Sequence, residues 1–276
     1  MKSDTAQRGG MLMRRAERLL QEENLLCLPV DLERLAATRE IMLEPMSESK
    51  PGVSGMLIRH GNSFGILYDA TIQNPGYQRF SIAHELGHFF IDGHLDYVTS
   101  DRGVHESQAG FQSSDSYERE ADFFASGLLM PAALTGAVIR QQADGLAAVE
   151  AIQRETVASL TAAAIRYVDL SDIPVAVVVS REGRVDYSFL SDTLKSMTDI
   201  TWPRKGTAVP NDTVTDAIHG QPWGQASRES AEIDLRDWLG GSRRVRALEE
   251  VVTLGSYDRV LTIVTPLELV DDEYDY

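Results

Sequence analysis

Cysteine is nearly absent from the chain. Its one cysteine, Cys27, has no second cysteine with which to form an internal disulfide. This usage is typical of a protein from a reducing compartment. Long apolar runs are missing as well: nowhere do about 18 apolar residues follow one another, and residues 1–20 lack the apolar run of a signal peptide. We therefore expect a cytoplasmic protein without a membrane anchor.

Basic residues are scarce relative to acidic ones. The chain has 26 Lys and Arg against 42 Asp and Glu, which gives a formal net charge of −16. A field of this sign repels nucleic acid and attracts basic partners, and DNA-binding proteins are one such class. The length of 276 residues exceeds that of a typical single domain, so we expect two domains.

The segment RFSIAHELGHFF, residues 79–90, contains the HExxH pattern. His84 and His88 are four residues apart, so on a helix they project from one face and can hold one cation together. Zinc with three protein ligands keeps a position for water, and Glu85 is placed to accept the proton of that water. The pattern predicts a zinc peptidase. The alternative is a helix that carries two surface histidines by chance.

A third metal ligand has to come from another part of the chain. His94 stands where the longer HExxHxxGxxH pattern has its third histidine, but that pattern needs glycine at position 91 and the residue here is Ile91. The segment SYEREADFFASGLLMP, residues 116–131, predicts a second helix on which Glu118 and Asp122 are four apart. We expect Glu118 to complete a His/His/Glu site. Asp122 can accept the free ring N–H of a ligating histidine and so fix its tautomer.

Glu120 is the competing carboxylate on this second helix. It lies about 200° around the helix axis from Glu118, so only one of the two can face the metal. The apolar residues of the helix define a buried face closer to Glu118 and Asp122, and we therefore expect Glu120 to point to solvent. Alternatively, Glu118 is an exposed first-turn residue that the helix dipole favours.

The two motifs together resemble those of the ImmA/IrrE metallopeptidases. The resemblance rests on HELGH and on the block from Glu118 to Pro131. It extends to LPVDLERLA (28–36), SGMLIRHGNSFGILYD (54–69) and SLTAAAIRY (159–167). It is specific over residues 54–131 and weak after residue 170.

The resemblance implies a ligand set and a function. In that family the two histidines and the first glutamate of the second block bind the metal, which corresponds to His84, His88 and Glu118. The glutamate after the first histidine is the base, which corresponds to Glu85. Family members cleave helix-turn-helix repressors of phage, mobile-element or stress-response genes, so the resemblance implies regulatory proteolysis.

The region before the first motif predicts two helices and a hairpin. Residues 12–24 and 32–37 have helical periodicity, and Asp31 is a suitable cap for the second helix. Residues 53–59 and 64–69 predict a β-hairpin. If one hairpin strand forms the edge of the cleft, an extended substrate segment can pair with it. The alternative is an ordinary packing hairpin.

Residues 92–115 predict a long polar loop between the two metal helices. Loops of this length are unusual in a compact domain unless they are functional or disordered. A lid here could stabilise the oxyanion of the reaction through one of four side chains, and spacing does not single one out. These side chains are His94, Tyr97, His105 and Tyr117. The alternative for each is a surface or packing role.

The rest of the chain predicts a helical segment followed by strands. Residues 141–167 predict helices with Ser159 as a cap, and a structural helix pair is favoured over a DNA-binding one because only Arg154 and Arg166 are basic. Four β-rich runs then predict a mixed α/β domain: 173–180, 184–191, 245–252 and 259–267. Trp202, Trp223 and Trp238 either line a ligand pocket or belong to the core. The acidic segment 271–276 is expected to be solvated.

The expected fold is α+β. A mainly helical, zincin-like (gluzincin-type) peptidase domain with a small β-sheet spans residues 1–140. A helical connector, similar to a helix-turn-helix, spans 141–170, and a mixed α/β domain spans 171–276. The resemblance suggests a GAF-like sensor for this last domain.

The expected activity is that of a zinc-dependent, site-specific endopeptidase, with Mn²⁺ as the other metal that accepts His/His/Glu ligation. Its expected substrate is a helix-turn-helix repressor. A small-molecule or nucleic-acid activator is expected at the C-terminal domain. The competing interpretation is a binding module that sequesters its partner and has a structural or vestigial metal site.

Overall fold

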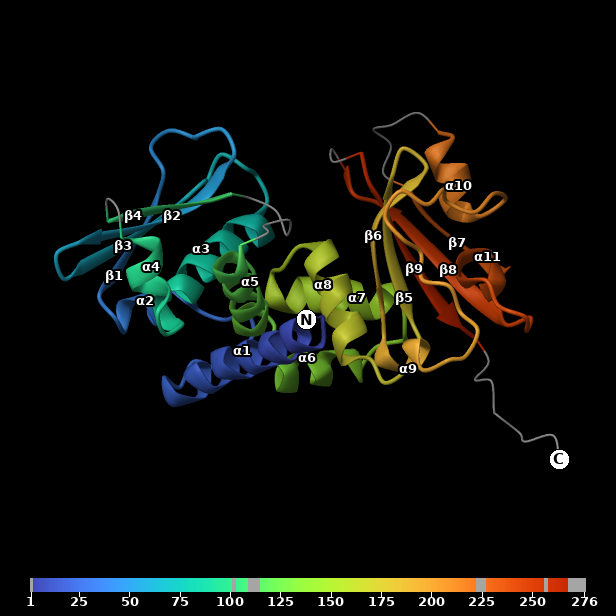
Figure 1. Ribbon diagram of the computed structural model, residues 1–276, viewed down its shortest axis with the longest axis horizontal. Coiled ribbons are helices and arrows are strands. Elements are labelled where there is room, and N and C mark those ends of the chain that lie inside the picture. The colour runs from blue at the N-terminus through green and yellow to red at the C-terminus, as the bar shows by residue number, and fades with distance from the viewer. Residues whose placement is uncertain (1, 101–102, 109–114, 222–226, 256–257, 268–276) are drawn as a thin grey trace. The chain divides into compact units, whose positions relative to one another are not determined.

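The computed structural model of the protein describes residues 2–100, 103–108, 115–221, 227–255 and 258–267. It is a mixed α/β structure with two compact units (Figure 1). Unit 1 comprises Met1–Gln141 and Ala151–Ala162, and unit 2 comprises Gln142–Glu150 and Ala163–Tyr276. The division between them passes through helices α7 (Leu146–Thr156) and α8 (Leu160–Leu170).

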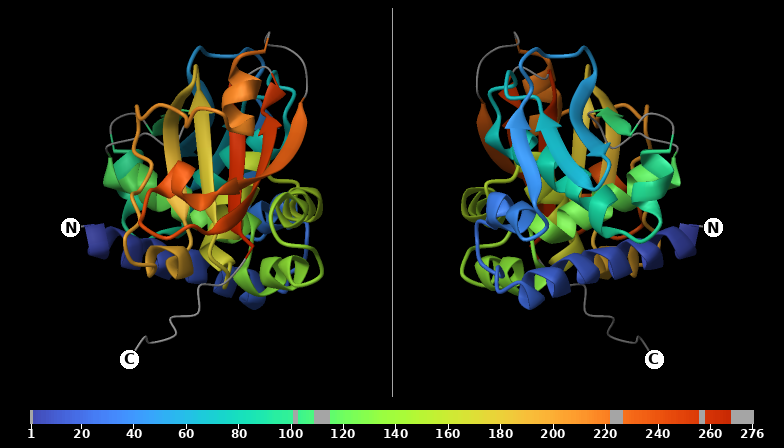
Figure 2. Two further views of the ribbon diagram at one scale, coloured as in Figure 1. Left: turned by 90° about the vertical axis from the view of Figure 1, so that its right-hand side faces the viewer. Right: turned by 90° about the vertical axis from the view of Figure 1, so that its left-hand side faces the viewer.

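Unit 1 combines helices with a four-stranded sheet. Its other helices are α1 (Lys2–Glu22), α2 (Leu32–Ala37), α3 (Pro75–Phe90), α4 (His94–Val98), α5 (Ser116–Leu129) and α6 (Ala132–Ile139). Its strands are β1 (Ile41–Pro45), β2 (Val53–His60), β3 (Ser63–Tyr68) and β4 (Val104–Gln108), in the order β1-β3-β2-β4. β1 is parallel to β3, and β2 is antiparallel to β3 and to β4. Figures 1 and 2 show α1 on the side of unit 1 away from the sheet.

Local signals in the sequence explain where α3 begins. Asn74 caps it by accepting a hydrogen bond from the backbone N–H of Tyr77, and Pro75 occupies the first turn, where no N–H is needed. Every residue from Ser81 to His88 is buried. A helix this deeply buried must approach its neighbours closely, and Gly87 permits this: a Cβ added there would lie 3.2 Å from the Cα of Ala121 on α5.

Several expectations for unit 1 are confirmed and others are wrong. Asp31 caps α2 as expected, and the predicted hairpin is β2–β3. α1 begins ten residues earlier than the periodicity indicated, at Lys2 instead of residue 12. The expected loop 92–115 contains α4 and β4, although residues 101–102 and 109–114 lie outside the described part. The hairpin was considered as the edge of the cleft, but β2 and β3 both lie inside the sheet. The strand at the edge beside β2 is β4.

Unit 2 is built on a five-stranded antiparallel sheet in the order β6-β5-β9-β8-β7. The strands are β5 (Ala176–Arg181), β6 (Arg184–Leu190), β7 (Arg228–Asp234), β8 (Arg246–Thr253) and β9 (Val260–Pro266). Short helices accompany them: α9 (Asp192–Lys195), α10 (Val214–His219) and α11 (Leu235–Leu239). The left view of Figure 2 shows α10 and α11 in front of this sheet.

The four predicted β-rich runs correspond to β5, β6, β8 and β9, whereas β7 was not predicted. Its sequence RESAEID is polar and lacks apolar alternation, which an edge strand can tolerate because it has a neighbouring strand on one side only. Trp238 belongs to the buried core, while Trp202 is 41% exposed. Trp223 and the acidic segment 271–276 lie outside the described residues.

Among the described residues, no helix is by itself long and apolar enough to cross a membrane. α5 and α6 reach that measure only together, across a bend of 57°.

A buried carboxylate ties α10 and α11 to the sheet of unit 2. Glu249 on β8 is fully buried. It accepts hydrogen bonds from the Val214 N–H at 2.9 Å, the Thr215 hydroxyl at 2.7 Å and the Trp238 indole N–H at 3.1 Å. Three donors from two helices therefore meet on one side chain, which compensates the cost of burying it.

We expect Glu249→Ala to lower the free energy of unfolding by about 3 kcal/mol, because three buried donors lose their acceptor. Chemical denaturation followed by tryptophan fluorescence measures this. The matched control is Glu232→Ala on β7, whose ion pair with Arg246 is exposed and should change stability by less than about 1 kcal/mol. Equal effects of the two substitutions would contradict the anchoring role.

Candidate metal centre

Three elements of unit 1 bring four potential metal ligands together. α3 supplies His84 and His88, α5 supplies Glu118, and β4 supplies His105. One donor atom from each of these residues lies within 4.8 Å of all the others. The Nε2 atoms of His84 and His88 are 3.1 Å apart, and they lie 3.2 Å and 3.3 Å from the Glu118 oxygens. The donor atoms thus surround one point.

The donor set fits a divalent metal ion. The Nε2 atom of His105 lies 3.1 Å from Glu118 Oε1, yet it is buried without a hydrogen-bond partner among the described residues. An atom in this situation needs another partner, and a cation at the centre of the cluster would provide it. Three imidazoles and one carboxylate are ligands that zinc accepts. The cluster can therefore hold a metal ion.

The carboxylate of Asp122 lies beside the ring of His84. Its Nδ1 lies 2.9 Å from Asp122 Oδ1, one turn after Glu118 on α5. If Nδ1–H donates to Asp122, Nε2 presents its lone pair to the cluster. Burial opposes the charging of His84, but its contacts with Asp122 and Glu118 outweigh burial and raise its pKa to about 10. A proton and a metal ion therefore compete for this side chain.

His88 is prepared as a neutral ligand. It is fully buried, and burial lowers its pKa to about 3 despite the nearby Glu118 carboxylate. A neutral imidazole can bind a cation through Nε2 without first losing a proton. Glu118 is charged: burial opposes this, but the adjacent imidazoles of His105, His84 and His88 lower its pKa well below the usual value. The centre thus offers an anionic oxygen beside neutral nitrogen.

A chain of contacts reaches His88 at Nδ1, the ring nitrogen that faces away from the cluster. Its Nδ1 lies 3.3 Å from Nδ1 of His94, a residue that is 2% exposed. The Nε2 of His94 is 3.3 Å from Glu120 Oε2, and Arg8 donates to the same oxygen at 2.8 Å. If His94 donates to Glu120 through Nε2, its Nδ1 is free to accept from His88 Nδ1–H. His88 then presents Nε2 to the cluster.

This arrangement corrects one prediction and agrees with another. Glu120 does not simply point to solvent: its side chain is 22% exposed and contacts Arg8 and His94. The apolar pattern of α5 could not reveal these partners, since both come from other elements. His94 is not part of the ligand cluster, in agreement with the missing glycine at position 91.

Glu85 is buried beside the cluster without compensation. Its side chain is inaccessible, and neither carboxylate oxygen has a hydrogen-bond partner among the described residues. Burial raises its pKa, against the opposing effect of His84 and His105. Gly55 on β2 makes room for it, because a Cβ at that position would lie 2.8 Å from Glu85 Oε1. Burial without a hydrogen-bond donor thus favours the neutral, protonated form of this carboxyl group more than exposure to water would.

Among the four side chains considered for the oxyanion, the structure separates one from the rest. The rings of Tyr97 and Tyr117 stack with their centres 3.9 Å apart, and the ring centres of His94 and Tyr117 are 4.8 Å apart. His105 alone of the four lies in the ligand cluster. The signal that could have found it is the alternation of VHESQ, in which His105 and Ser107 share the less exposed side of β4.

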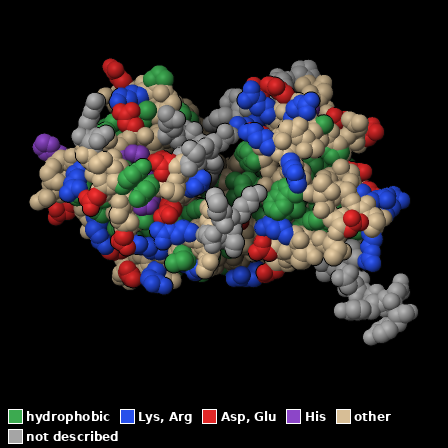
Figure 3. All heavy atoms as spheres, in the orientation of Figure 1, with side chains coloured by type: hydrophobic (Ala, Val, Ile, Leu, Met, Phe, Trp, Pro, Cys, Tyr) green, Lys and Arg blue, Asp and Glu red, His purple; other side chains and the backbone are tan. Residues whose placement is uncertain are grey.

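The centre is close to the surface of unit 1. The side chains of Glu118, Asp122 and His105 are 17%, 16% and 16% exposed. On the face shown in Figure 3, histidine side chains of unit 1 reach the surface beside acidic and apolar ones. A ligand from solvent can therefore approach the cluster.

Comparisons with known proteins place these residues within one family domain. Residues 49–168 match the model of the IrrE N-terminal-like domain, Peptidase_M78. Among solved structures, the chain is similar to a Mycobacterium tuberculosis transcriptional regulator, with a TM-score of 0.60 and 15% sequence identity over 92% of this chain and 76% of that chain. At this identity the likeness concerns the fold alone. No curated protein matches the chain at a significant level.

We expect His94→Leu to lower the zinc affinity of the protein about tenfold, because His88 loses the acceptor that orients its ring. His94→Asn keeps an acceptor near the position of Nδ1 and should retain most of the affinity. Competition with a chromogenic zinc chelator measures both variants. Thermal unfolding without zinc checks that each variant is folded. Equal affinity of His94→Leu and the unmodified protein would contradict the orienting role.

Proposed function

Because residues 49–168 match the model of the IrrE N-terminal-like domain, Peptidase_M78, we propose that the protein is a cytoplasmic zinc-dependent endopeptidase with a specific protein substrate. The observation that carries the proposal is the convergence of His84, His88 and Glu118 beside the buried, unpartnered Glu85. His84, His88 and Glu118 bind the metal, and Asp122 orients His84. The fold proposed for this domain is zincin-like (gluzincin-type).

Glu85 acts as the general base. When bound, the metal supplies the positive charge that acidifies water and polarises a peptide carbonyl. Glu85 accepts the proton of the attacking water and returns it to the leaving amine. Burial, which raises the pKa of Glu85, brings its basicity closer to that needed for both transfers.

His105 decides between a catalytic and a structural centre. Four protein ligands close a zinc site, whereas a catalytic zinc keeps one position open. We assign His105 to the open side, where its Nε2 donates to the negative charge that develops on the peptide carbonyl oxygen. Its place on β4, rather than on a helix of the HExxH core, supports this assignment.

The substrate is proposed to be a helix-turn-helix repressor, cleaved so that phage, mobile-element or stress-response genes are derepressed. The net charge of −16 favours a basic DNA-binding partner. β4 is an edge strand and carries His105, so an extended substrate segment that pairs with it would pass beside the metal centre. We propose that the peptidase domain spans residues 1–140 and that a helical connector spans residues 141–170.

The C-terminal domain, residues 171–276, is proposed to regulate cleavage. Unit 2 has its own sheet and its own core, which includes Leu190, Trp238 and Val264. A separate folded unit without a metal cluster among its described residues suits a sensor role. We propose a GAF-like domain that responds to a small-molecule or nucleic-acid signal.

The second candidate function is sequestration of a partner by a protein whose metal site is structural. The four-membered donor set favours it, because four protein ligands are typical of structural zinc. Glu85 weighs against it. A carboxyl group buried without partners costs stability, and a purely structural site has no use for it.

Glu85→Gln should reduce cleavage of a helix-turn-helix repressor by at least about a hundredfold, since the amide cannot accept a proton. Incubation of the repressor encoded beside the gene with zinc and each protein, followed by intact-mass measurement, tests this. The zinc affinity of Glu85→Gln should stay close to that of the unmodified protein. Cleavage at equal rates by both proteins would exclude Glu85 as the base. Tight binding without cleavage by either would favour sequestration.

His105→Ala should keep the zinc affinity within about threefold and lower kcat by about a hundredfold, because a donor to the oxyanion is lost. The zinc affinity is measured by chelator competition and kcat with the repressor substrate. A loss of zinc affinity by more than about tenfold would make His105 the fourth ligand. That result would support the structural alternative.

A further inference from the structure

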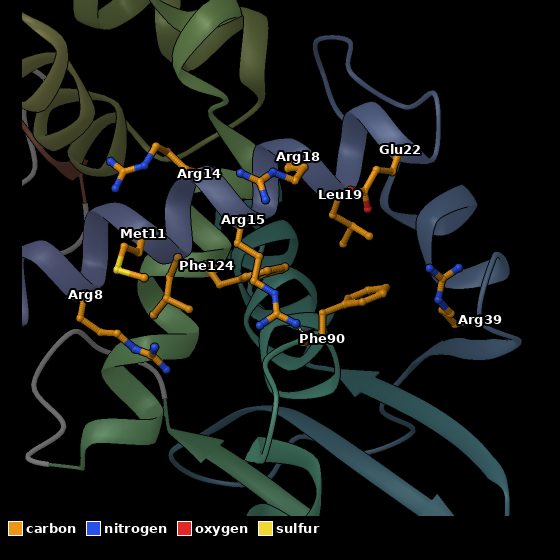
Figure 4. Close-up of a pocket in the computed structure, with 11 residues that line it drawn as sticks. Arg8, Met11, Arg14, Arg15, Arg18, Leu19, Glu22, Arg39, Phe90 and Phe124 are labelled. Atoms are coloured by element: carbon orange, nitrogen blue, oxygen red, sulfur yellow. Dashed lines mark hydrogen bonds between the residues drawn. The ribbon is translucent and has the colours of Figure 1, made fainter.

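An arginine-lined groove runs along α1, apart from the metal centre (Figure 4). Its volume is about 650 Å³. Five of the chain's 26 basic residues line it: Arg8, Arg14, Arg15, Arg18 and Arg39. Met11, Leu12, Leu19, Phe90 and Phe124 supply its apolar part. We call this cavity the arginine groove. Such a concentration of positive charge is unexpected in a chain with a net charge of −16.

The arginines reach the groove from two sides. Figure 4 shows Arg8 and Arg15 extending from α1 toward Phe124 and Phe90, and Arg39 approaching from the other end. The guanidinium of Arg39 lies 5.5 Å from the centre of the Phe90 ring. Arg15 donates to the backbone oxygen of Phe90 at 2.8 Å, which ties its guanidinium to the end of α3.

Arg8 and Arg39 are paired with the half-buried carboxylates of Glu120 and Glu23, at 2.8 Å and 2.6 Å. The guanidinium groups of Arg14, Arg15 and Arg18 are available to a ligand. Arg15 pairs with Asp92 at 2.9 Å, but the Asp92 side chain is 89% exposed, and ion pairs of this kind contribute little. Arg14 and Arg18 have no ion-pair partner in the described part of the chain. An incoming anion can therefore replace Asp92 at Arg15 and gain contacts with Arg18 without breaking a buried interaction.

The chemistry of the groove favours phosphate. A guanidinium offers two parallel N–H donors that match phosphate oxygens, and arginine is the preferred residue for such contacts. The volume is within the range of roughly 300–1,000 Å³ of small-molecule sites. The apolar residues can cover an uncharged part of the same ligand.

The surroundings of the groove limit the ligand to a compact one. Glu22 lines it, and Asp92 and Glu120 are ion-paired to its arginines. These carboxylates would repel a long polyanion that extends past the arginines, as would the net charge of −16. A ligand with its charge gathered in one or two phosphate groups avoids this repulsion.

We propose that the arginine groove binds a compact phosphate-bearing anion of nucleotide size. The head group contacts Arg15 and Arg18, and the rest of the ligand lies along Met11 and Leu19. None of the groove residues belongs to the ligand cluster. Arg8 contacts Glu120 in the support of His88, but the head group is placed at Arg15 and Arg18, which take no part in that support.

Isothermal titration of the full-length chain with pyrophosphate and with ADP tests the proposal. The titrations are made at constant ionic strength, first with a chelator present and then with zinc. Phosphate bound at the metal centre would appear only with zinc. We expect saturable one-site binding of both probes in the chelated protein, with a Kd below about 1 mM.

Two substitutions should shift this affinity in opposite directions. Arg15→Gln/Arg18→Gln should weaken binding by at least about tenfold, because two charged donors are lost. Asp92→Asn should strengthen it about threefold, because the competing carboxylate of Arg15 is removed. The opposite signs separate a binding effect from a loss of folding. Arg34→Gln/Arg140→Gln, which changes exposed arginines of unit 1 outside the groove, should leave the affinity unchanged.

Three results would overturn the proposal. The first is no saturable binding of either probe to the chelated protein. The second is binding that survives Arg15→Gln/Arg18→Gln. The third is binding of a single-stranded oligonucleotide or an oligoglutamate peptide in preference to the two compact probes, which would indicate a macromolecular partner.

Discussion

The close crossing of α3 and α5 is the constraint on which the metal centre depends. At Gly87 the two helices approach so closely that a Cβ would lie 3.2 Å from the Cα of Ala121. His84 and His88 flank Gly87, and Glu118 and Asp122 flank Ala121. A larger side chain at either crossing position would separate the helices, and the ring nitrogens of α3 would no longer reach the carboxylates of α5. Two small residues at the crossing thus allow the donor atoms of the two helices to meet.

Buried carboxylates serve two different purposes in this protein. Glu249 in unit 2 is surrounded by donors from α10 and α11, so its burial stabilises one packing arrangement. Glu85 in unit 1 has no hydrogen-bond partner among the described residues, so its burial costs stability and gives no anchoring in return. A protein retains such a cost where a group has to act on a ligand. The contrast is the physical basis for treating Glu85 as part of a reactive site.

Local patterns predicted much of this structure. The HExxH spacing placed His84 and His88 on one face of α3, and the block after Ser116 placed Glu118 and Asp122 one turn apart on α5. Capping residues located α2. The patterns missed the edge strands β4 and β7, because the sequences of both are polar and resemble loops. They also failed for Glu120, whose partners Arg8 and His94 come from other elements.

The sequence alone determined which side chains can share a helical face, because helical periodicity depends only on spacing along the chain. It therefore supplied the two histidines, the adjacent carboxyl group and the second pair of carboxylates. Only the tertiary structure decided which elements meet. It brought His105 on β4 to the cluster, joined His88 through His94 to Glu120, and gathered arginines of α1 with Arg39 in one groove. These contacts join residues that are distant along the chain, and sequence spacing carries no information about such distances.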